Sequence, residues 1–408
     1  MPVITIFSGA YCGGDEVSKN LSETLGYELT DDEGLIERAS RGGLPSDKLR
    51  RALAGKSSVF NTFTHERERA VAAFKSVIAQ LLGRDGLILA GHGGHLVPPS
   101  IAHVVKICLI ADFRFRVNRA VERDGLTEAQ AMRRVRKEDE GGTEWTEFVL
   151  HNEPWNPSLY DIVIPMDKTS VDEAVDIVVS NVRKKVVQPT EASIQAVRDF
   201  ALTSAVEVAL AAEGHDVDIH ASGGHVTLTI NKHVIMLARL EEELRRIAGA
   251  VPGVSSVETK IGPRFYQADI YRRHDFEVPS KVLLVDDERE FAQTLSERLS
   301  MRDVGSAIAY DGEEALSVIA EDEPEVMVLD LKMPGIDGIE VLRRVKRDHP
   351  DVEVIILTGH GSAEDEKTCL ELGAFAYLSK PVDIDALSEA MKAAYQKIRD
   401  RESERGDA

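Results

Sequence analysis

Five side chains suited to phosphoryl transfer occur in the last third of the chain: Asp286, Asp287, Asp330, Thr358 and Lys380. A carboxylate can accept a phosphoryl group only if the incoming negative charge is neutralised, which requires a hard cation held by oxygen ligands. The three aspartates can supply such ligands to Mg²⁺. Lys380 can pair with a phosphoryl oxygen as a point charge, and the Thr358 hydroxyl can hydrogen-bond another. These residue types predict a Mg²⁺-assisted aspartyl-phosphate site.

The same residues end or directly follow short apolar runs, which is the pattern of buried strands. Including a weaker run without a site residue, the runs are 281–285, 306–310, 326–329, 352–357 and 376–379. Helical patterns alternate with them, so five strands and five helices predict a doubly wound, five-stranded parallel sheet. In such sheets functional groups gather at the carboxyl ends of the strands. A single strand-end aspartate is usually a turn or cap residue, but the complete set in this context favours a site.

On these residues, segment 281–400 resembles the response-regulator receiver domain. The resemblance implies a cognate sensor histidine kinase as partner, Mg²⁺ as cofactor and, as an option, a homodimer through the receiver. It implies that Asp330 is the phosphoacceptor, with Thr358 and Lys380 as its catalytic partners. Asp286 and Asp287 would bind the metal ion together with Asp330. Thr358 and Tyr377 would form the switch, in which the aromatic side chain changes rotamer on activation. It also implies a cis bond between Lys380 and Pro381.

Composition limits the function classes that remain. The chain has 408 residues, 43% of them hydrophobic, which suits two to four domains with buried cores. A formal net charge of −21 argues against direct nucleic-acid binding, and no basic helix-turn-helix follows the receiver. Three isolated cysteines suit a reducing compartment. No apolar run approaches the roughly 20 residues needed to cross a bilayer, so a soluble, cytoplasmic protein is expected.

Residues 1–186 begin with the elements of a phosphate-binding loop. A strand at 3–7, a glycine-rich turn at 8–14 and a helix at 15–25 would point backbone N–H groups at an anion. The spacing from Gly9 to Gly14 matches the first half of a Walker A loop, but Asp15 and Glu16 replace its Lys and Ser/Thr. Glycine used only for tight turning is the alternative explanation.

Further buried strands at 87–91, 104–111 and 162–164 and an arginine-rich helical pair follow the loop. Their order resembles the cytidylate-kinase-like family of P-loop nucleoside monophosphate kinases over almost the whole segment. The resemblance implies a P-loop parallel sheet and these candidate nucleotide or phosphate ligands: Gly9, Gly13, Gly14, Asp31, Arg116, Arg119, Arg133 and Lys137. A solvated helix face is the alternative role of the basic residues.

Several positions depart from that family. The loop lacks the arginine of its relatives, His92 replaces an arginine after Gly91, and Glu140 replaces another. Positive groups stabilise the charge on a transferred phosphoryl group, so their loss predicts a degenerate kinase domain that binds ATP or another nucleotide weakly. An ATP-dependent nucleotide kinase that still turns over is the alternative.

Residues 187–265 predict a small αβ module with no catalytic constellation. The pattern Gly224-x-Val-x-Leu228, a helix and Val251-Pro-Gly-Val254 resemble a BON domain, which implies association with a ligand or a membrane surface. Residues 266–280 are expected to be a linker, 281–400 the receiver and 401–408 a tail. The three modules predict a two-component response regulator without DNA-binding output, in which Asp330 phosphorylation signals to the two N-terminal modules. A phosphorylation-gated, cytidylate-type nucleoside monophosphate kinase is the alternative.

Overall fold

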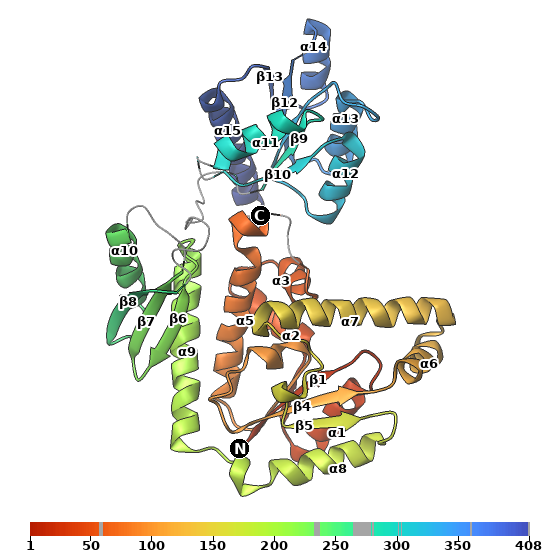
Figure 1. The fold of residues 1–408 in the computed structure, drawn as a ribbon, viewed down its shortest axis with the longest axis vertical. Helices are drawn as coiled ribbons and strands as arrows, with labels where there is room; N and C mark the ends of the chain where they lie inside the picture. Colours follow the sequence, from red (N-terminus) through yellow and green to blue (C-terminus); the bar gives the residue numbers. More distant parts are fainter. Residues whose placement is uncertain are drawn as a thin grey trace. The chain divides into compact units, whose positions relative to one another are not determined.

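The computed structural model describes residues 1–56, 60–231, 237–263, 279, 281–300, 302, 304–359 and 361–406. The chain forms two compact units (Figure 1). The first unit comprises residues 1–57, 67–212 and 216–271, and the second comprises 58–66, 213–215 and 272–408. Apart from residue 279, the linker expected at 266–280 lies outside the described residues. Among the helices that are described, none is both long enough and apolar enough to cross a membrane.

The first unit contains a five-stranded parallel sheet in the order β2-β3-β1-β4-β5. Its strands are β1 (Val3–Ser8), β2 (Glu28–Thr30), β3 (Leu87–Ala90), β4 (Val104–Ile110) and β5 (Ile162–Pro165). Ile4 of β1, the central strand, is paired with Ile88 on one side and Val105 on the other. All three side chains are buried, as expected for a parallel sheet covered on both faces.

Helices cover both faces of this sheet. One core packs α1 (Gly14–Leu25) and α8 (Val171–Val182) against the strands, through apolar residues spaced three or four apart. The other core contains α2 (Asp32–Ser40), α3 (Ser46–Leu53), α5 (Glu66–Leu82) and Trp145 of α7 (Glu128–Leu150). Helix α6 (Phe113–Asp124) packs on α7 through a small apolar cluster. The mixed α/β fold predicted for this segment is confirmed.

Helix α9 (Glu191–Ala212) contributes to two cores. Val197 and Phe200 pack with α5 in the core of the kinase-like segment. Val206 and Leu210 pack instead with a three-stranded sheet of β6 (Asp218–Ser222), β7 (His225–Ile230) and β8 (Ser256–Ile261), covered by α10 (Leu237–Gly249). Strands β6 and β7 are antiparallel and β7 and β8 are parallel. Helix α9 thus belongs both to a core of the first sheet and to the core of the small αβ module.

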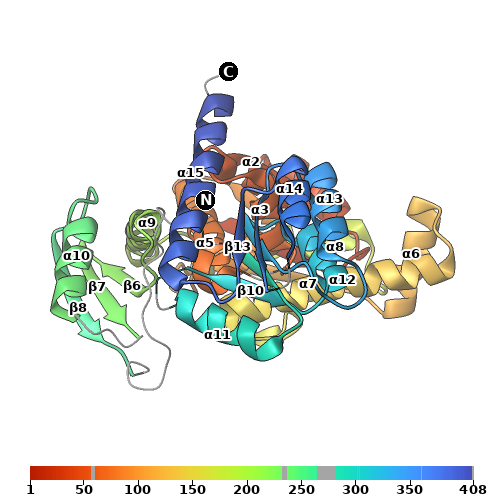
Figure 2. The same cartoon turned by 90° about the horizontal axis from the view of Figure 1, so that it is seen from above.

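The second unit contains a five-stranded parallel sheet in the order β10-β9-β11-β12-β13. Its strands are β9 (Val282–Val285), β10 (Ser306–Ala309), β11 (Val326–Leu329), β12 (Glu353–Thr358) and β13 (Ala376–Ser379). Helices α11 (Arg289–Ser300) and α15 (Ile384–Gly406) cover one face, and α12 (Gly312–Glu321), α13 (Gly338–Asp348) and α14 (Ala363–Glu371) cover the other (Figure 2). The predicted doubly wound sheet is confirmed, and the weak run at 306–310 is its edge strand.

Candidate functional site

The ladder hydrogen bonds of the second sheet place the candidate residues at one edge. Asp286 N donates to Ala309 O at 3.1 Å, and Asp330 N donates to Val285 O at 2.9 Å. Each aspartate therefore directly follows its strand, and its backbone N–H is still hydrogen-bonded to the neighbouring strand. Lys380 N likewise donates to the carbonyl of Thr358 at 2.9 Å. Because parallel strands end at a common edge, these side chains emerge together.

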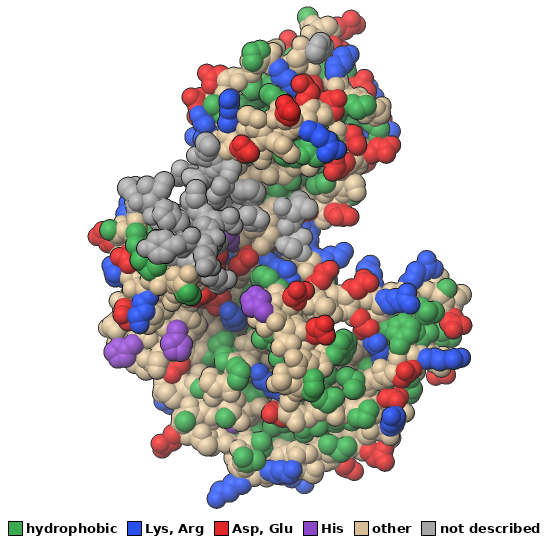
Figure 3. Space-filling model, viewed as in Figure 1, with side chains coloured by type: hydrophobic (Ala, Val, Ile, Leu, Met, Phe, Trp, Pro, Cys, Tyr) green, Lys and Arg blue, Asp and Glu red, His purple; other side chains and the backbone are tan. Residues whose placement is uncertain are grey.

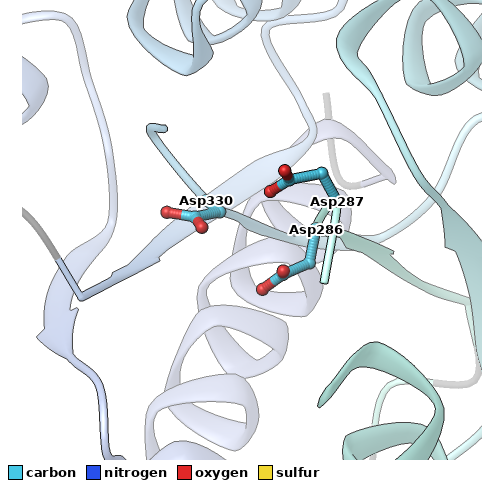
Figure 4. A group of neighbouring side chains, drawn as sticks. All are labelled: Asp286, Asp287 and Asp330. Atoms are coloured by element: carbon cyan, nitrogen blue, oxygen red, sulfur yellow. The ribbon is translucent and has the colours of Figure 1, made fainter. Parts of the chain in front are cut away.

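The carboxylates of Asp286, Asp287 and Asp330 form an acidic cluster (Figure 4). One ligand oxygen from each lies within 4.8 Å of the others, and no second group of this kind occurs among the described residues. Asp286 and Asp330 are buried, whereas Asp287 is exposed. Burial raises the pKa of the Asp286 carboxyl above 3.8, and the adjacent Asp330 carboxylate acts in the same direction. An all-oxygen donor set with this excess negative charge fits a hard divalent cation such as Mg²⁺.

The positively charged side chain of Lys380 contacts this acidic cluster. Its Nζ lies 2.6 Å from Asp286 Oδ2, 3.0 Å from Asp330 Oδ2 and 3.2 Å from Glu288 Oε1, and its side chain is only 11% exposed. Burial alone would lower the pKa of Lys380, but the two aspartates outweigh burial and raise the pKa above its ordinary value. The ammonium group is therefore charged and lies at one oxygen of Asp330, where a phosphoryl group attached to Asp330 would need a positive partner.

The other oxygen of Asp330 is held by the backbone. Oδ1 accepts a hydrogen bond of 2.6 Å from Leu331 N and a longer one of 3.4 Å from Lys332 N. The loop that supplies these donors returns to α13 at Gly338, whose N–H donates to Leu331 O at 3.2 Å. A Cβ at position 338 would lie 2.3 Å from the carbonyl oxygen of Asp330. Gly338 thus permits the close approach that orients Asp330. The sequence analysis did not single out this glycine, although Pro334, Gly335 and Gly338 mark a tight loop after Asp330.

Thr358 and Tyr377 meet at the neighbouring strands β12 and β13. Thr358 is 2% exposed, and the Tyr377 hydroxyl occupies the space above Gly361, where an added Cβ would also contact the Thr358 methyl group at 3.0 Å. The Tyr377 hydroxyl is buried and has no hydrogen-bond partner among the residues that the structure describes, and burial raises its pKa. A buried, unsatisfied hydroxyl costs about 1–3 kcal/mol, so a change of the Tyr377 rotamer that gave this hydroxyl a partner would recover this free energy. The expected cis bond between Lys380 and Pro381 is present.

The glycine-rich turn of the first unit forms the strand-to-helix loop that its sequence predicts. Gly13 has a left-handed φ of 86°, and α1 begins at Gly14. A Cβ at Gly14 would lie 2.6 Å from Ser8 Cβ, so this turn requires glycine. A pocket of about 400 Å³ lies over the loop, lined by Gly9, Gly13 and Gly14 and also by Asp31.

The arginines expected to bind phosphate at this loop are engaged by carboxylates. Arg116 donates two hydrogen bonds to Asp139, at 2.7 and 2.8 Å. Arg119 lies over Gly13 and donates to Glu16 at 2.8 Å. The two remaining basic candidates, Arg133 and Lys137, are exposed on α7 and do not line the pocket over the loop.

Acidic side chains dominate the lining of this pocket. They are Asp15, Glu16, Asp31, Asp32, Glu33, Asp124 and Glu138. Among the described residues, the arginines that line it are Arg123 and Arg134. The sequence analysis did not single them out, because the pattern of the arginine-rich helices does not show which residues face the loop. Such a lining repels a polyphosphate, since like charges at short range in a partly buried site are unfavourable.

Asp31 and His92 each form hydrogen bonds with other residues of the first unit. Asp31 is the N-cap of α2, accepting a hydrogen bond from Gly34 N at 2.8 Å. His92, where the family resemblance leads us to expect an arginine, is bound by Asp32 through both its backbone N–H and its ring, at 2.9 and 2.7 Å. Burial alone would lower the pKa of His92, but Asp32 outweighs it and raises the pKa above 6.5.

Comparison with known proteins covers both units. Residues 282–392 match the family described as the response regulator receiver domain, and residues 3–168 match the cytidylate kinase-like family. Response regulator MprA of Mycobacterium ulcerans (strain Agy99) is 34% identical over 128 residues, 31% of this chain and 55% of that protein. Response regulator MprA of Mycolicibacterium vanbaalenii is 37% identical over 116 residues, 28% of this chain and 50% of that protein.

Among solved structures, the receiver domain of the Francisella response regulator 1452 is 34% identical, with a TM-score of 0.28, and the match covers 29% of this chain and 98% of that one. The chain spans about half the length of the curated relatives that it matches. The receiver and cytidylate-kinase-like resemblances predicted from the sequence are thereby supported. The BON-like assignment of residues 187–265 stays a prediction.

Proposed function

We propose that this protein is a two-component response regulator in which Asp330 accepts a phosphoryl group from a sensor histidine kinase. The observation that carries the proposal is the convergence of three aspartates and Lys380 at one sheet edge, with Lys380 Nζ 3.0 Å from Asp330 Oδ2. An aspartate held by two backbone N–H groups and a partly buried lysine is oriented to act as a nucleophile toward phosphorus.

Each residue at the edge has a separate task in this proposal. Asp286, Asp287 and Asp330 would hold Mg²⁺, which, when bound, supplies positive charge to the phosphoryl oxygens. Lys380 exchanges its contact with the Asp330 carboxylate for a phosphoryl oxygen, so the charge gained on Asp330 is met without moving the ammonium far. Thr358 turns its hydroxyl to another phosphoryl oxygen, and Tyr377 occupies the space that Thr358 leaves.

We propose that the output of this switch is a change in what the kinase-like and small αβ modules bind. The output is neither DNA binding nor nucleotide turnover. The observation favouring this output is that Arg116 and Arg119 are already paired with Asp139 and Glu16. Removing cationic groups from a phosphoryl-transfer site lowers its rate by orders of magnitude. Acidic and basic side chains are also interspersed on the face of both units seen in Figure 3, without the basic field that a nucleic acid requires.

Two assays on the full chain test the proposal. The first follows incorporation of phosphate from acetyl phosphate with Mg²⁺ by phosphate-affinity electrophoresis, in the wild type and in Asp330→Asn. The second measures conversion of CMP and other nucleoside monophosphates by ATP, with and without beryllofluoride and Mg²⁺ to mimic phosphorylated Asp330. Labelling confined to the wild type, without nucleotide turnover in either state, is expected. Turnover that depends on the mimic would instead establish the alternative, a phosphorylation-gated nucleotide kinase.

A further inference from the structure

A second pocket of the first unit differs in charge from the pocket over the glycine loop. It has a volume of about 520 Å³ and lies between the end of α2 with its following loop, one face of α5 and the last turns of α9. That volume is within the range of small-molecule sites. We name it the arginine pocket for four residues that line it: Arg38, Arg41, Arg69 and Arg84.

The arginine pocket has positive walls in an acidic protein. Its lining contains no aspartate or glutamate, although the chain carries a net charge of −21. Arg38 and Arg84 bind opposite oxygens of one carboxylate, Glu28, at 2.8 and 3.3 Å. Two guanidinium groups that share one carboxylate keep a net positive charge and have donors left for a further anion.

Arg41 adds a third guanidinium group, and its ion pair within the protein is weak. Its partner is Glu37, four residues earlier on the same segment, and both side chains are about 70% exposed, at 70% and 72%. Exposed ion pairs of this kind stabilise a protein only weakly. An anion entering the pocket can therefore recruit Arg41 with little loss of stability.

Apart from Ser76 and Gln80, the remaining side chains that line the arginine pocket are aliphatic. They include Leu44, Val77 and Leu81 on one side and Val208 and Ala211 of α9 on the other. None of the described residues that line it is aromatic, so it offers no aromatic ring on which a nucleobase could stack. The lining face of α5 extends from Arg69 to Leu81, which is about 18 Å along the helix. This shape suits a chain-like apolar group better than a ring.

The α9 wall lies outside the segment that matches the cytidylate-kinase-like family, which ends at residue 168. Lys75 of α5 and Glu207 of α9 form an ion pair at 2.9 Å beside the pocket, with both side chains less than a third exposed. The neighbouring residues Val206 and Leu210 pack in the core of the small αβ module. A ligand in the arginine pocket would thus contact the helix that the two cores share.

We propose that the arginine pocket binds an aliphatic anion, a molecule with an alkyl chain and a carboxylate or phosphate head group. The head group is held by the guanidinium groups of Arg38, Arg41 and Arg84, and the chain lies between α5 and α9. This ligand site is independent of Asp330 and of nucleotide binding at the glycine loop, so its test stands apart from that of the proposed function.

Isothermal titration calorimetry on the full chain tests this site with four probes. Decanoate and decyl phosphate carry the proposed head groups, decyltrimethylammonium has the same chain with a cationic head, and inorganic phosphate has no chain. The variants are Arg38→Gln/Arg84→Gln, which removes two cations, and Ala211→Trp, which fills the pocket. Arg183→Gln is the matched control, because Arg183 is an exposed arginine that does not line the pocket. Far-ultraviolet circular dichroism confirms that each variant is folded.

Both decyl anions are expected to bind with one-to-one stoichiometry, and decyltrimethylammonium is not. Each pocket variant should weaken anion binding at least about tenfold, while Arg183→Gln leaves it unchanged. The proposal is overturned if the folded wild type binds neither anion, or if the cationic probe binds as tightly as the anions. It is also overturned if Ala211→Trp binds decanoate as the wild type does, or if inorganic phosphate binds as tightly as decyl phosphate.

Discussion

Lys380 Nζ and Asp330 Oδ2 lie 3.0 Å apart, although the two residues are 50 positions apart in the chain. Lys380 also contacts Asp286 at 2.6 Å, so one ammonium group bridges two buried carboxylates from different strands. Two buried carboxylates at this spacing would repel each other without it. The contact therefore stabilises the arrangement before phosphorylation and leaves a cation beside the oxygen that would carry the phosphoryl group.

Substituting Asp330 tests the phosphoacceptor. Asp330→Asn keeps the shape of the side chain but removes the nucleophilic carboxylate, so labelling by acetyl phosphate in Mg²⁺ should fall to background. Intact-mass spectrometry of the full chain provides the measurement. Asp348→Asn is the control, since Asp348 is an exposed carboxylate of the same unit paired with Arg347, and it should label normally. Undiminished labelling of Asp330→Asn would mean that another residue accepts the phosphoryl group.

Lys380→Gln should destabilise the second unit and make its stability more dependent on Mg²⁺. Loss of the ammonium leaves Asp286 and Asp330 buried without a cation, and breaking a buried pair in this way costs about 3–5 kcal/mol. Hydrogen exchange of the β9 and β11 amides in metal-free buffer measures the loss. Mg²⁺ should restore more protection in the variant than in the wild type.

The control for that experiment is Lys367→Gln, because Lys367 is 77% exposed and only loosely paired with Glu371. Equal protection of β9 and β11 in Lys380→Gln and Lys367→Gln would show that the bridge does not stabilise this edge of the sheet.

Gly338→Ala should disrupt the loop that orients Asp330. The new methyl group would approach the carbonyl oxygen of Asp330 to 2.3 Å and Leu331 Cα to 2.7 Å, and neither backbone atom can move alone. We expect destabilisation of about 1–3 kcal/mol and slower phosphorylation by acetyl phosphate. Gly359→Ala is the matched control, because its nearest contact, Lys380 Cβ at 3.8 Å, is an ordinary one. Normal labelling rates in both variants would refute a positioning role for Gly338.

Two acidic residues are expected to prevent ATP binding at the glycine loop. Asp15→Lys alone should change ATP affinity little, because Glu16 still holds Arg119 at 2.8 Å. Asp15→Lys/Glu16→Ser frees Arg119 and should raise affinity for a fluorescent ATP analogue about tenfold. Glu23→Lys, an exposed change on the same helix, controls for net charge. An unchanged affinity in the double variant would mean that the loop is not a phosphate site.

His95 should make the first unit sensitive to acid. Burial, assisted by His92 and Lys106, lowers the pKa of His95 from 6.5 to about 3. Below pH 6.5 the unfolded chain therefore binds a proton that the folded chain does not, and the free energy of unfolding falls as the pH falls from 6.5 toward about 3. His95→Gln should remove this part of the pH dependence.

Denaturation followed by tryptophan fluorescence reports on this unit, because the chain has two tryptophans, Trp145 and Trp155, and both lie in it. The comparison is the pH slope of the free energy of unfolding, not its absolute value, since His95→Gln also alters a hydrogen bond to Tyr160. His220→Gln, an exposed histidine of β6, should keep the wild-type slope. An identical slope in His95→Gln would show that His95 is not held neutral by burial.

The sequence by itself determined the parallel sheets and the edge at which the chemistry gathers. Short apolar runs ending in Asp286, Asp330, Thr358 and Lys380 require buried strands, and parallel strands end at a common edge. The residue types then predicted the chemistry, because carboxylates, a hydroxyl and an ammonium group keep their donor and acceptor character in any fold.

Only the tertiary structure decided which charges meet. It paired Lys380 with two aspartates, engaged Arg116 and Arg119 with Asp139 and Glu16, and divided α9 between two cores. Hydrophobic periodicity indicates which face of a helix or strand is buried, but it does not indicate which other segment covers that face. A salt bridge depends on side chains from distant segments converging within a few ångströms, so its partners are chosen by the packing of the whole unit.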